Sequence, residues 1–543
     1  FAGLLFASSL CSQTVPTPTP PPEDVLALSP FVITSTVDRG YQATSTLAGT
    51  RLKTELKDVG AAVSVYTQEF LEDIAATNLE SILTYALGTE GGGIGGNFAG
   101  FSGEFSDESR DNPSGVNRVR GLAPATRTRN YFASDIPSDT YNFSNLTVSR
   151  GPNAILSGNG SAGGVIDTTL NSAGFQDSFQ VKLRAGEHSS FREEIHLNKV
   201  LIAKKLSFRL DGLNEDRRFR QKPTFDRDRR ITLSATWRVR EPPRDAFFGS
   251  TTIRANHEFG RIEGTPPETL TPLLSIESWF DGIDPRNGSP WQSPKWRANG
   301  AQQLITTASG ATVPNANIIA GFPLFRNWGL IYADQASGRA GVGFTDPALA
   351  PIQGFMGTIP TGTAGPGGFV RGTGDENRSR AGFAWTRLTN RDVFDFYNQL
   401  MTGAFDHRGQ KFNATDVRLE QLLLGGKAGL EFAYNRQDFE RTRDFPISGN
   451  ENQIFIDTSE YLSIRTDAYP SQPVANQLIR NPNFGRPMIV SRDAFRDQIN
   501  TSFREAIQLS AFIQHDFTKA KSRFVKHLGR HTLSGLYFDN TIS

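Results

Sequence analysis

The residues of this 543-residue chain that could do chemistry begin with a glycine-rich stretch. Residues 158–163 read GNGSAG, a complete G-x-G-x-x-G match. In nucleotide-binding proteins this spacing joins a strand to a helix, and the N–H groups at the start of that helix bind the pyrophosphate. Here the glycines run into residues 164–169 (GVIDTT), a β-branched run typical of a strand. Because no helix is expected after the glycines, the sequence does not favour a dinucleotide site.

No other residues have the spacing of a catalytic or metal site. The 7 histidines include no H-E-x-x-H motif, 1 cysteine cannot build a zinc cluster, and no G-x-S-x-G motif occurs. Glu193 and Glu194 are adjacent, so on a strand they point to opposite faces and cannot act as a pair. We expect no enzymatic activity, no cofactor and no metal. With 57 Lys+Arg against 56 Asp+Glu, we also expect no nucleic-acid partner.

The first residues have the composition of an export signal and a tether. Residues 1–13 begin with FAGLLFASSLC, apolar with small residues towards the end, which predicts a partial signal peptide, with a buried strand as the alternative. Residues 14–24 are Pro-rich and predict an extended linker. No stretch of ~18 consecutive apolar residues follows, so no membrane-spanning helix is expected. A membrane protein with this sequence would have to be a β-barrel.

Residues 51–170 predict a small α+β unit, because the local patterns change every few residues. Residues 61–67 (AAVSVYT) predict a strand. Residues 67–87 predict one helix that begins at a Thr67 cap. Residues 88–103 are glycine-rich and predict a mobile loop, and further short strands are expected before residue 170.

From residue 179 onward, apolar and polar residues alternate with a period of two. In residues 231–239 (ITLSATWRV) one face carries Ile, Leu, Ala, Trp and Val, and the other carries Thr, Ser and Arg. A soluble sandwich and a transmembrane barrel both use such strands. The runs approach the length of about 9 to 11 residues expected of membrane strands, which favours the barrel. The irregular stretch from Asn256 to about Asn390 is typical of long barrel loops.

Two segments then identify a family resemblance. Residues 117–122 (NRVRGL) and 148–170 (VSRGPNAILSGNGSAGGVIDTTL), followed by alternating strands, closely resemble the TonB-dependent receptors of Gram-negative outer membranes. The resemblance implies an α+β plug domain followed by an antiparallel transmembrane β-barrel of about 22 strands. It divides the chain into a leader at 25–50, a plug domain at 51–170 and the N-terminal part of the barrel at 175–543. Since only about ten strands are recognisable, we expect the barrel to be truncated in this chain.

The resemblance also implies a function. It predicts TonB-dependent active transport of a scarce ligand across the outer membrane, most commonly an iron–siderophore, with a glycan or cobalamin as alternatives. The implied partners are the TonB–ExbB–ExbD complex, outer-membrane lipid and the small ligand, bound by a monomer with its plug in the barrel lumen and its N-terminus in the periplasm. A secreted or cell-surface β-sandwich binding or adhesion protein remains the alternative.

The site residues implied by the resemblance lie in the leader and the plug. The candidate TonB box is Phe31, Val32, Ile33 and Thr34, with the plug's first strand as the other interpretation of this segment. Arg120 and Arg150 match two plug arginines that are expected to pair with glutamates of the barrel. The remaining plug-motif residues allow tight turns and close backbone approach: Gly121, Gly151, Pro152, Gly158, Gly160, Gly163 and Gly164.

Overall fold

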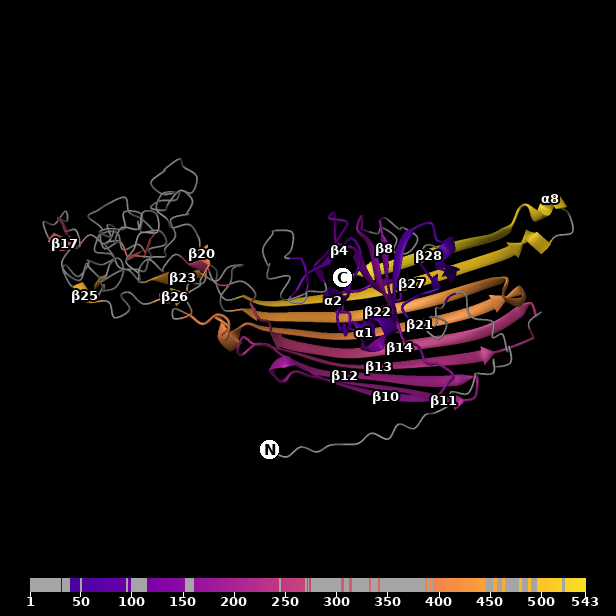
Figure 1. Ribbon diagram of the computed structural model, residues 1–543, viewed down its shortest axis with the longest axis horizontal. Helices are drawn as coiled ribbons and strands as arrows, with labels where there is room; N and C mark the ends of the chain where they lie inside the picture. The colour runs from indigo at the N-terminus through magenta and orange to yellow at the C-terminus, as the bar shows by residue number, and fades with distance from the viewer. Residues whose placement is uncertain are drawn as a thin grey trace, which may run out of the picture.

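The chain forms a small plug unit that lies across one face of a large antiparallel sheet (Figure 1). The computed structural model describes residues 31, 40–48, 51–93, 96–98, 115–151, 161–243, 246–268, 271, 391, 394–445, 496–519 and 523–543, together with short strand segments between 273 and 489. The expected signal segment and Pro-rich linker lie outside the described residues. Within the described residues, no helix is both long enough and apolar enough to span a membrane.

The large sheet has nine strands, and all of its neighbouring strands pair antiparallel. Their order in the sheet follows the chain, and their lengths range from 8 to 21 residues. The strands are β10 (Ser178–Ala185), β11 (Phe191–Ile202), β12 (Leu206–Arg218), β13 (Phe225–Arg240), β14 (Phe248–Thr265), β21 (His407–Leu423), β22 (Ala428–Phe445), β27 (Arg496–Asp516) and β28 (Arg530–Ile542). The sheet is therefore an open section of barrel, with β10 and β28 at its edges.

The two ends of the sheet differ in the length of their connections. At one end β11 and β12 are joined through residues 203–205, and β21 and β22 through 424–427; we call this the short-turn end. At the opposite, long-loop end, β14 and β21 are joined through 266–406, and β22 and β27 through 446–495. Long connections thus gather on one side, as expected. The expected start of the irregular stretch at Asn256 is wrong, because β14 continues to Thr265.

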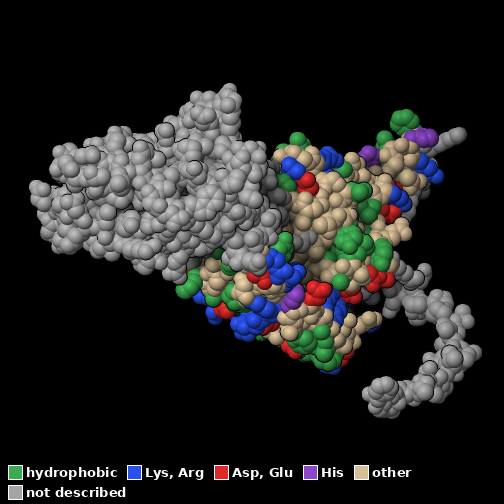
Figure 2. Space-filling model, turned by 60° about the vertical axis from the view of Figure 1, so that its left-hand side comes forward, with side chains coloured by type: hydrophobic (Ala, Val, Ile, Leu, Met, Phe, Trp, Pro, Cys, Tyr) green, Lys and Arg blue, Asp and Glu red, His purple; other side chains and the backbone are tan. Residues whose placement is uncertain are grey.

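The predicted alternation is confirmed in β13. Ile231 and Trp237 are 52% and 49% exposed, whereas Thr232 and Ser234 are 0% and 2% exposed. The polar face is buried because it meets the plug, and the apolar face points outward. Patches of hydrophobic side chains on the described surface are visible in Figure 2.

The plug is an α+β unit, as predicted. Its central sheet has the order β3-β8-β9-β6-β7, and helices α1 and α2 cover its core, which contains Leu71, Ile82 and Leu146. The plug elements are β3 (Ala62–Thr67), α1 (Gln68–Asp73), α2 (Leu79–Leu83), β4 (Thr89–Gly91), β5 (Asn117–Val119), β6 (Thr126–Arg129), β7 (Phe132–Ala133), η3 (Thr140–Asn142), β8 (Phe143–Arg150) and β9 (Gly164–Leu170). Strand β4 pairs with β5, so the glycine-rich stretch after residue 87 begins as a strand rather than as a loop.

The remaining elements are short. Before the plug sheet come β1 (Ser45–Thr46), β2 (Thr54–Glu55) and η1 (Leu56–Asp58). Among and after the long strands lie η4 (Glu187–Ser189), η6 (Gly403–Phe405), η7 (Leu424–Gly426), η8 (Phe517–Lys519) and α8 (Arg523–Lys526). The short strand segments are β15 (Leu273–Leu274), β16 (Leu304–Thr306), β17 (Thr312–Pro314), β18 (Tyr332–Ala333), β19 (Ala340–Gly341), β20 (Thr386–Arg387), β23 (Gln453–Ile456), β24 (Tyr461–Ser463), β25 (Leu478–Arg480) and β26 (Pro487–Ile489).

The predicted single helix over 67–87 is wrong. Thr67 does cap a helix, and its side chain accepts from the Phe70 N–H at 3.3 Å. The helix ends after one and a half turns because Ala75 adopts a left-handed conformation with φ of 55°. Asn78 then caps α2 by accepting from the Ser81 N–H at 3.1 Å. An asparagine cap in the middle of an apolar helical pattern is a signal for two helices.

Candidate functional site at the plug and sheet interface

One plug segment, residues 129–142, contacts most strands of the large sheet. It begins at the end of β6 and turns sharply at Asn130 and Tyr131, which both have positive φ. Asp167 holds this turn, because its carboxylate accepts from the Tyr131 N–H and the Thr128 hydroxyl, both at 2.6 Å. Burial raises the pKa of Asp167, although these hydrogen bonds oppose the shift. The turn directs the rest of the segment onto the sheet.

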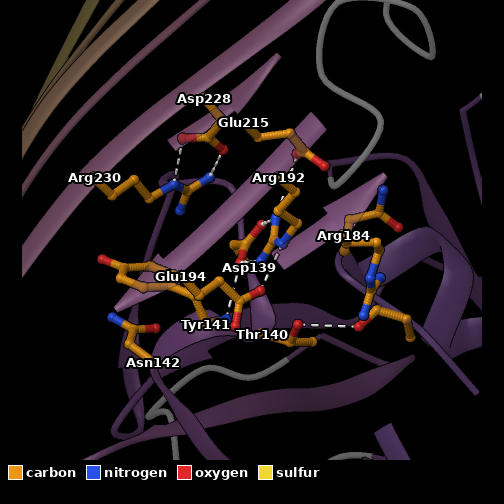
Figure 3. A network of polar contacts seen from close by, with 12 residues as sticks. Asp139, Thr140, Tyr141, Asn142, Arg184, Arg192, Glu194, Glu215, Asp228 and Arg230 are labelled. Carbon is orange, nitrogen blue, oxygen red and sulfur yellow. Dashed lines mark hydrogen bonds and ion pairs between the residues drawn. The ribbon is translucent and has the colours of Figure 1, made fainter. Parts of the chain in front are cut away.

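Arg192 of β11 forms the main ionic contact with this segment (Figure 3). Its Nη1 and Nη2 donate to the two carboxylate oxygens of Asp139 at 3.0 and 2.7 Å. Its Nε donates to Glu194 at 2.6 Å, and Nη1 also lies 3.3 Å from Glu215. Arg192 and Asp139 are 3% and 5% exposed. The result is a bidentate, water-shielded pair between plug and sheet, a geometry that favours arginine over lysine.

A second polar cluster surrounds Glu258 of β14. The Tyr141 hydroxyl lies 2.8 Å from Glu258 and donates to it, and the Asn142 amide donates to the same carboxylate at 3.2 Å. Arg129 at the start of the segment also donates to Glu258. Burial raises the pKa of Tyr141, and the charge of Glu258 adds to the shift. Tyr141 therefore stays protonated and remains a donor.

The middle of the segment contacts the strands at the other side of the sheet. Asp135 accepts from Arg504 of β27 at 2.7 and 2.9 Å, and from Ser502 at 2.8 Å. Burial alone would raise the pKa of Asp135, but the hydrogen bonds and charge of Arg504 outweigh it and lower that pKa. Ser134 donates to Gln437 of β22 at 2.6 Å. The same segment thus reaches strands at both sides of the sheet.

Apolar contacts between these polar groups are few. Phe132 stacks on Phe538 of β28 with ring centroids 6.2 Å apart, and it packs against Ala433 and Ala506. Ile136 packs in a separate cluster with three residues of β14 and β21, which are Ile262, Phe412 and Ala414. Among the described residues, the contact between segment 129–142 and the sheet is therefore held largely by hydrogen bonds and ion pairs, with two small apolar clusters.

The leader also contacts the sheet. Phe31, the first residue of the candidate TonB box, is 2% exposed and packs edge-on against Phe512 with ring centroids 5.3 Å apart. Val32, Ile33 and Thr34 lie outside the described residues. Arg51, the first residue of the plug domain, donates to Gln508 of β27 and lies over the Tyr131 ring at 4.5 Å. Burial, together with the charge of Arg418, lowers the pKa of Arg51 to about 10.

Among the described residues, Arg120 and Arg150 do not make the contacts with barrel glutamates that the resemblance implies. Arg150 donates to the Leu87 carbonyl at 2.8 Å and to the Ser64 hydroxyl at 2.9 Å, so its partners belong to the plug. Arg120 is exposed, and its backbone has a positive φ of 53°. Among the described residues, neither arginine pairs with a carboxylate of the large sheet. Arg129 instead makes the contact with the sheet glutamate Glu258.

The motif glycines act on the backbone of the plug. Gly121, Gly151 and Gly164 have positive φ. A Cβ at Gly163 would lie 2.5 Å from the Ala123 carbonyl oxygen, and a Cβ at Gly164 would overlap the Ser149 carbonyl oxygen. These glycines allow the close approach expected of them. Three further motif residues lie outside the described residues: Pro152, Gly158 and Gly160.

No sequence motif marks the carboxylates and arginines that form the interface. Asp139, Tyr141, Arg192 and Glu258 carry no motif, and the spacing between partners exceeds 50 residues. A signal does exist on the strand side, because Arg192 and Glu194 belong to the inward-facing set of β11. Among the described residues, no group of three or more His, Cys, Asp or Glu could hold a metal ion.

Comparison with known proteins finds similarities over parts of this chain. Residues 55–165 match the family model described as the TonB-dependent Receptor Plug Domain. The chain is 25% identical over 262 residues to the ferrioxamine B receptor of Salmonella typhimurium strain SL1344, which covers 47% of this chain and 35% of the relative. It is 30% identical over 152 residues to the probable TonB-dependent receptor BfrD of Bordetella pertussis, which covers 27% of this chain and 18% of the relative.

Further similarities extend over part of each protein. The chain is 24% identical over 240 residues to the ferrichrome outer membrane transporter/phage receptor of Escherichia coli K12, which covers 42% of this chain and 30% of the relative. A solved structure of the ferric preacinetobactin receptor BauA from Acinetobacter baumannii aligns with a TM-score of 0.46 at 11% identity, covering 93% of this chain and 61% of that one. The alignments with the three curated relatives thus cover between 18% and 35% of the relatives' length.

Proposed function

We propose that this chain is a TonB-dependent receptor, with a plug domain docked on an antiparallel barrel sheet, and that it carries out energy-coupled uptake of an iron–siderophore across the outer membrane of a Gram-negative bacterium. In this proposal the plug closes the barrel until the TonB–ExbB–ExbD complex, acting through the leader, displaces it. The short-turn end, from which the first strand β10 starts, faces the periplasm. The long-loop end faces outward and receives the ligand.

The ligands named for the relatives support an iron–siderophore as the ligand. Two of the reported relatives are receptors for ferrioxamine B and ferrichrome. None of the reported relatives is described as a glycan or cobalamin receptor, so neither alternative has support. The β-sandwich alternative also lacks support, because the apolar face of the sheet is exposed and, among the described residues, no second sheet covers it.

The observation that carries the proposal is the composition of the plug and sheet interface. A plug that must leave or rearrange should be held by contacts that water can replace. The bidentate pair of Asp139 and Arg192 and the hydrogen bond from Ser134 to Gln437 are contacts of this kind. Release of an apolar interface of the same size would expose its whole area to water, and this exposure would cost about 25 cal/mol of free energy per Å².

A reversible tether between plug and sheet tests the proposal. Ser134→Cys and Gln437→Cys, introduced together into the complete gene, place a thiol on each side of a contact whose side-chain oxygens lie 2.6 Å apart. Cysteine is shorter than glutamine, so a short bis-methanethiosulfonate cross-linker joins the two thiols, and a reductant releases them. Cross-linking should abolish uptake of ferrioxamine B or ferrichrome by whole cells while their binding persists, and reduction should restore uptake. Each single cysteine variant, treated with the same reagent, is the matched control. Full uptake with the cross-link quantitatively formed would show that this contact need not open.

A second test addresses energy coupling. Val32→Pro removes one backbone donor and fixes φ, so it should prevent the segment 31–34 from adding as a strand to TonB. Uptake should then fail while binding to intact cells stays near normal. If the unmodified receptor takes up no ferric siderophore in cells that contain TonB, the proposed function itself is wrong.

A further inference from the structure

The hairpin of β27 and β28 projects beyond its neighbour β22 at the short-turn end. Strand β22 pairs with β27 only as far as Ile513, whereas β28 pairs with β27 as far as Asp516. Residues 517–529 then join β27 to β28, a longer connection than 203–205 or 424–427 at the same end. Figure 1 shows α8, part of this connection, at the tip of the sheet. We call residues 515–518 and 524–531 the hairpin tip.

The hairpin tip has an ordered base. The Phe517 N–H donates to the Gly529 carbonyl at 2.9 Å, which closes the turn. The Phe517 ring contacts the rings of His515 and His531, with centroids 4.3 and 5.7 Å away. The Nε2 atom of His531 lies 2.6 Å from the Leu528 carbonyl oxygen. The exposed side chains of the turn are therefore presented from a base held by hydrogen bonds and ring contacts.

The hairpin tip is strongly basic. Residues 517–531 include five Lys and Arg residues and no Asp or Glu. Lys526 is exposed and, among the described residues, makes no ion pair. The Arg530 side chain is 74% exposed and lies 3.9 Å from Asp516. An ion pair so long and so exposed is weak, so Arg530 remains open to another anion.

An exposed aromatic ring accompanies these cations. Phe524 is 80% exposed, and Leu528 in the same turn is 49% exposed. Phe524 and Lys526 both belong to α8, so the ring and the ammonium group are presented by one short element. An aromatic side chain buries a large area when a flat partner covers its face. The hairpin tip thus offers separate cations with an aromatic face among them.

We propose that the hairpin tip binds a carboxylate-bearing glycan polymer, the chemistry of the cell wall on the periplasmic side of the outer membrane. The inference rests on the proposed orientation, in which the short-turn end faces the periplasm. Carboxylates repeated along a polymer each meet one exposed cation, so weak contacts add up through multivalency. The Phe524 ring covers the face of a sugar ring between them. A lipid surface fits less well, because the tip projects past β22 and away from the apolar face of the sheet.

Co-sedimentation with purified cell-wall sacculi tests the proposal. The receptor expressed from the complete gene is held in nanodiscs of phosphatidylcholine, and its bound fraction is measured against the sacculus concentration. The probes are native sacculi, sacculi whose carboxylates are amidated, and phosphatidylglycerol vesicles. We expect native sacculi to bind about 10-fold more tightly than amidated sacculi, and more tightly than the vesicles. Equal binding of the two kinds of sacculi, or tighter binding to the vesicles, would overturn the proposal.

Matched variants locate the site. Lys526→Gln with Arg530→Gln should weaken binding to native sacculi by about 10-fold, and both side chains are exposed, so the fold should persist. Lys204→Gln with Lys205→Gln is the control, because it removes two exposed cations from another turn at the same end. Phe524→Ser should weaken binding by about 3- to 10-fold with no change of charge. Equal effects of the two double variants, or unchanged binding by Phe524→Ser, would overturn the proposal.

The same samples separate this inference from the proposed function. Binding of ferrioxamine B and ferrichrome is measured on the unmodified receptor and on the variant with Lys526→Gln and Arg530→Gln. Loss of sacculus binding with siderophore binding intact supports the glycan site. Siderophore binding by an unmodified receptor that does not bind sacculi overturns the glycan site and leaves the proposed function standing.

Discussion

Replacing the two partners of the pair between plug and sheet should have unequal effects on plug stability. Asp139→Asn keeps the volume and the oxygen that accepts from the Tyr141 N–H at 2.9 Å, so the local turn is preserved. It removes one charge and one acceptor facing Arg192, which keeps Glu194 and Glu215 as partners. A hydrogen bond to a charged group contributes about 1.5–3 kcal/mol, so we expect the free energy of plug opening to fall by about 2–3 kcal/mol.

Arg192→Met should be the more damaging change. It leaves Asp139, Glu194 and Glu215 facing one another without the cation that holds them together. Removing one partner from a buried ion pair costs about 3–5 kcal/mol, because the remaining charge is left uncompensated. The double variant should lose less than the sum of the two, with a coupling energy of about 1–3 kcal/mol.

Native-state hydrogen exchange of plug amides, followed by mass spectrometry of the full chain in detergent, measures this free energy. Asp139→Asn should accelerate exchange in residues 129–142 by about 30- to 150-fold, since 1.36 kcal/mol corresponds to tenfold. Lys182→Met is the control, because the pair of Lys182 and Glu72 is partly exposed and should contribute only about 0–1 kcal/mol. Equal effects of Asp139→Asn and Arg192→Met, or strict additivity in the double variant, would refute the reasoning.

Three other predictions follow from single positions. Burial raises the pKa of Glu80, which faces Arg217, Arg408 and Asp226, from 4.5 to about 7. The free energy of unfolding should therefore fall by about 3 kcal/mol as the pH rises from 4.5 to above 7. Glu80→Gln should abolish this loss when unfolding is measured as a function of pH. Gly164→Ala should destabilise the plug by at least about 3 kcal/mol in chemical unfolding. Gly174→Ala is the control, because nothing lies within 4 Å of its Cβ, and it should change stability by about 1 kcal/mol or less. Similar midpoints of denaturant unfolding for the two variants would contradict the packing argument. Trp237→Cys should react with a lipid-soluble maleimide, because the side chain of Trp237 is 49% exposed. Thr236→Cys should react only weakly with a water-soluble maleimide, because the side chain of Thr236 is 4% exposed. Equal labelling of the two variants by the water-soluble reagent would refute the assigned faces.

The large sheet could be predicted because its pattern depends on neighbours two residues apart. In residues 231–239 the outward face is apolar and the inward face is polar. This alternation belongs to the strand's own sequence, so it does not depend on which plug residues contact the strand. The break between α1 and α2 could not be predicted from the periodicity. The Ala76 carbonyl accepts from Thr140 at 3.0 Å, and the Ala75 carbonyl accepts from Arg184 of β10 at 3.0 Å. Both contacts come from distant segments, so they override the local helical preference.

The partners across the interface were hidden for a related reason. Ser134 and Gln437 are 303 positions apart, and the identity of each becomes meaningful only when the strand order of the sheet is known. The resemblance predicts plug and barrel contacts at Arg120 and Arg150, because both residues belong to the plug motif. The structure makes the plug and sheet contacts at Arg129, Asp135 and Asp139 instead. These residues lie in a turn-rich segment with no periodic pattern, so composition alone does not distinguish them from loop residues.

The polar interface also sets how the plug could be released in the proposed function. The pair of Asp139 and Arg192 and the pair of Asp135 and Arg504 contact opposite sides of the sheet, so a force applied through the leader need not break them together. Sequential loss of contacts that each contribute a few kcal/mol requires a lower peak force than simultaneous loss. Arg192 retains Glu194 and Glu215 when Asp139 leaves, so the sheet side of the contact keeps compensated charges after release. That retained compensation allows the same site to accept Asp139 again when the plug returns.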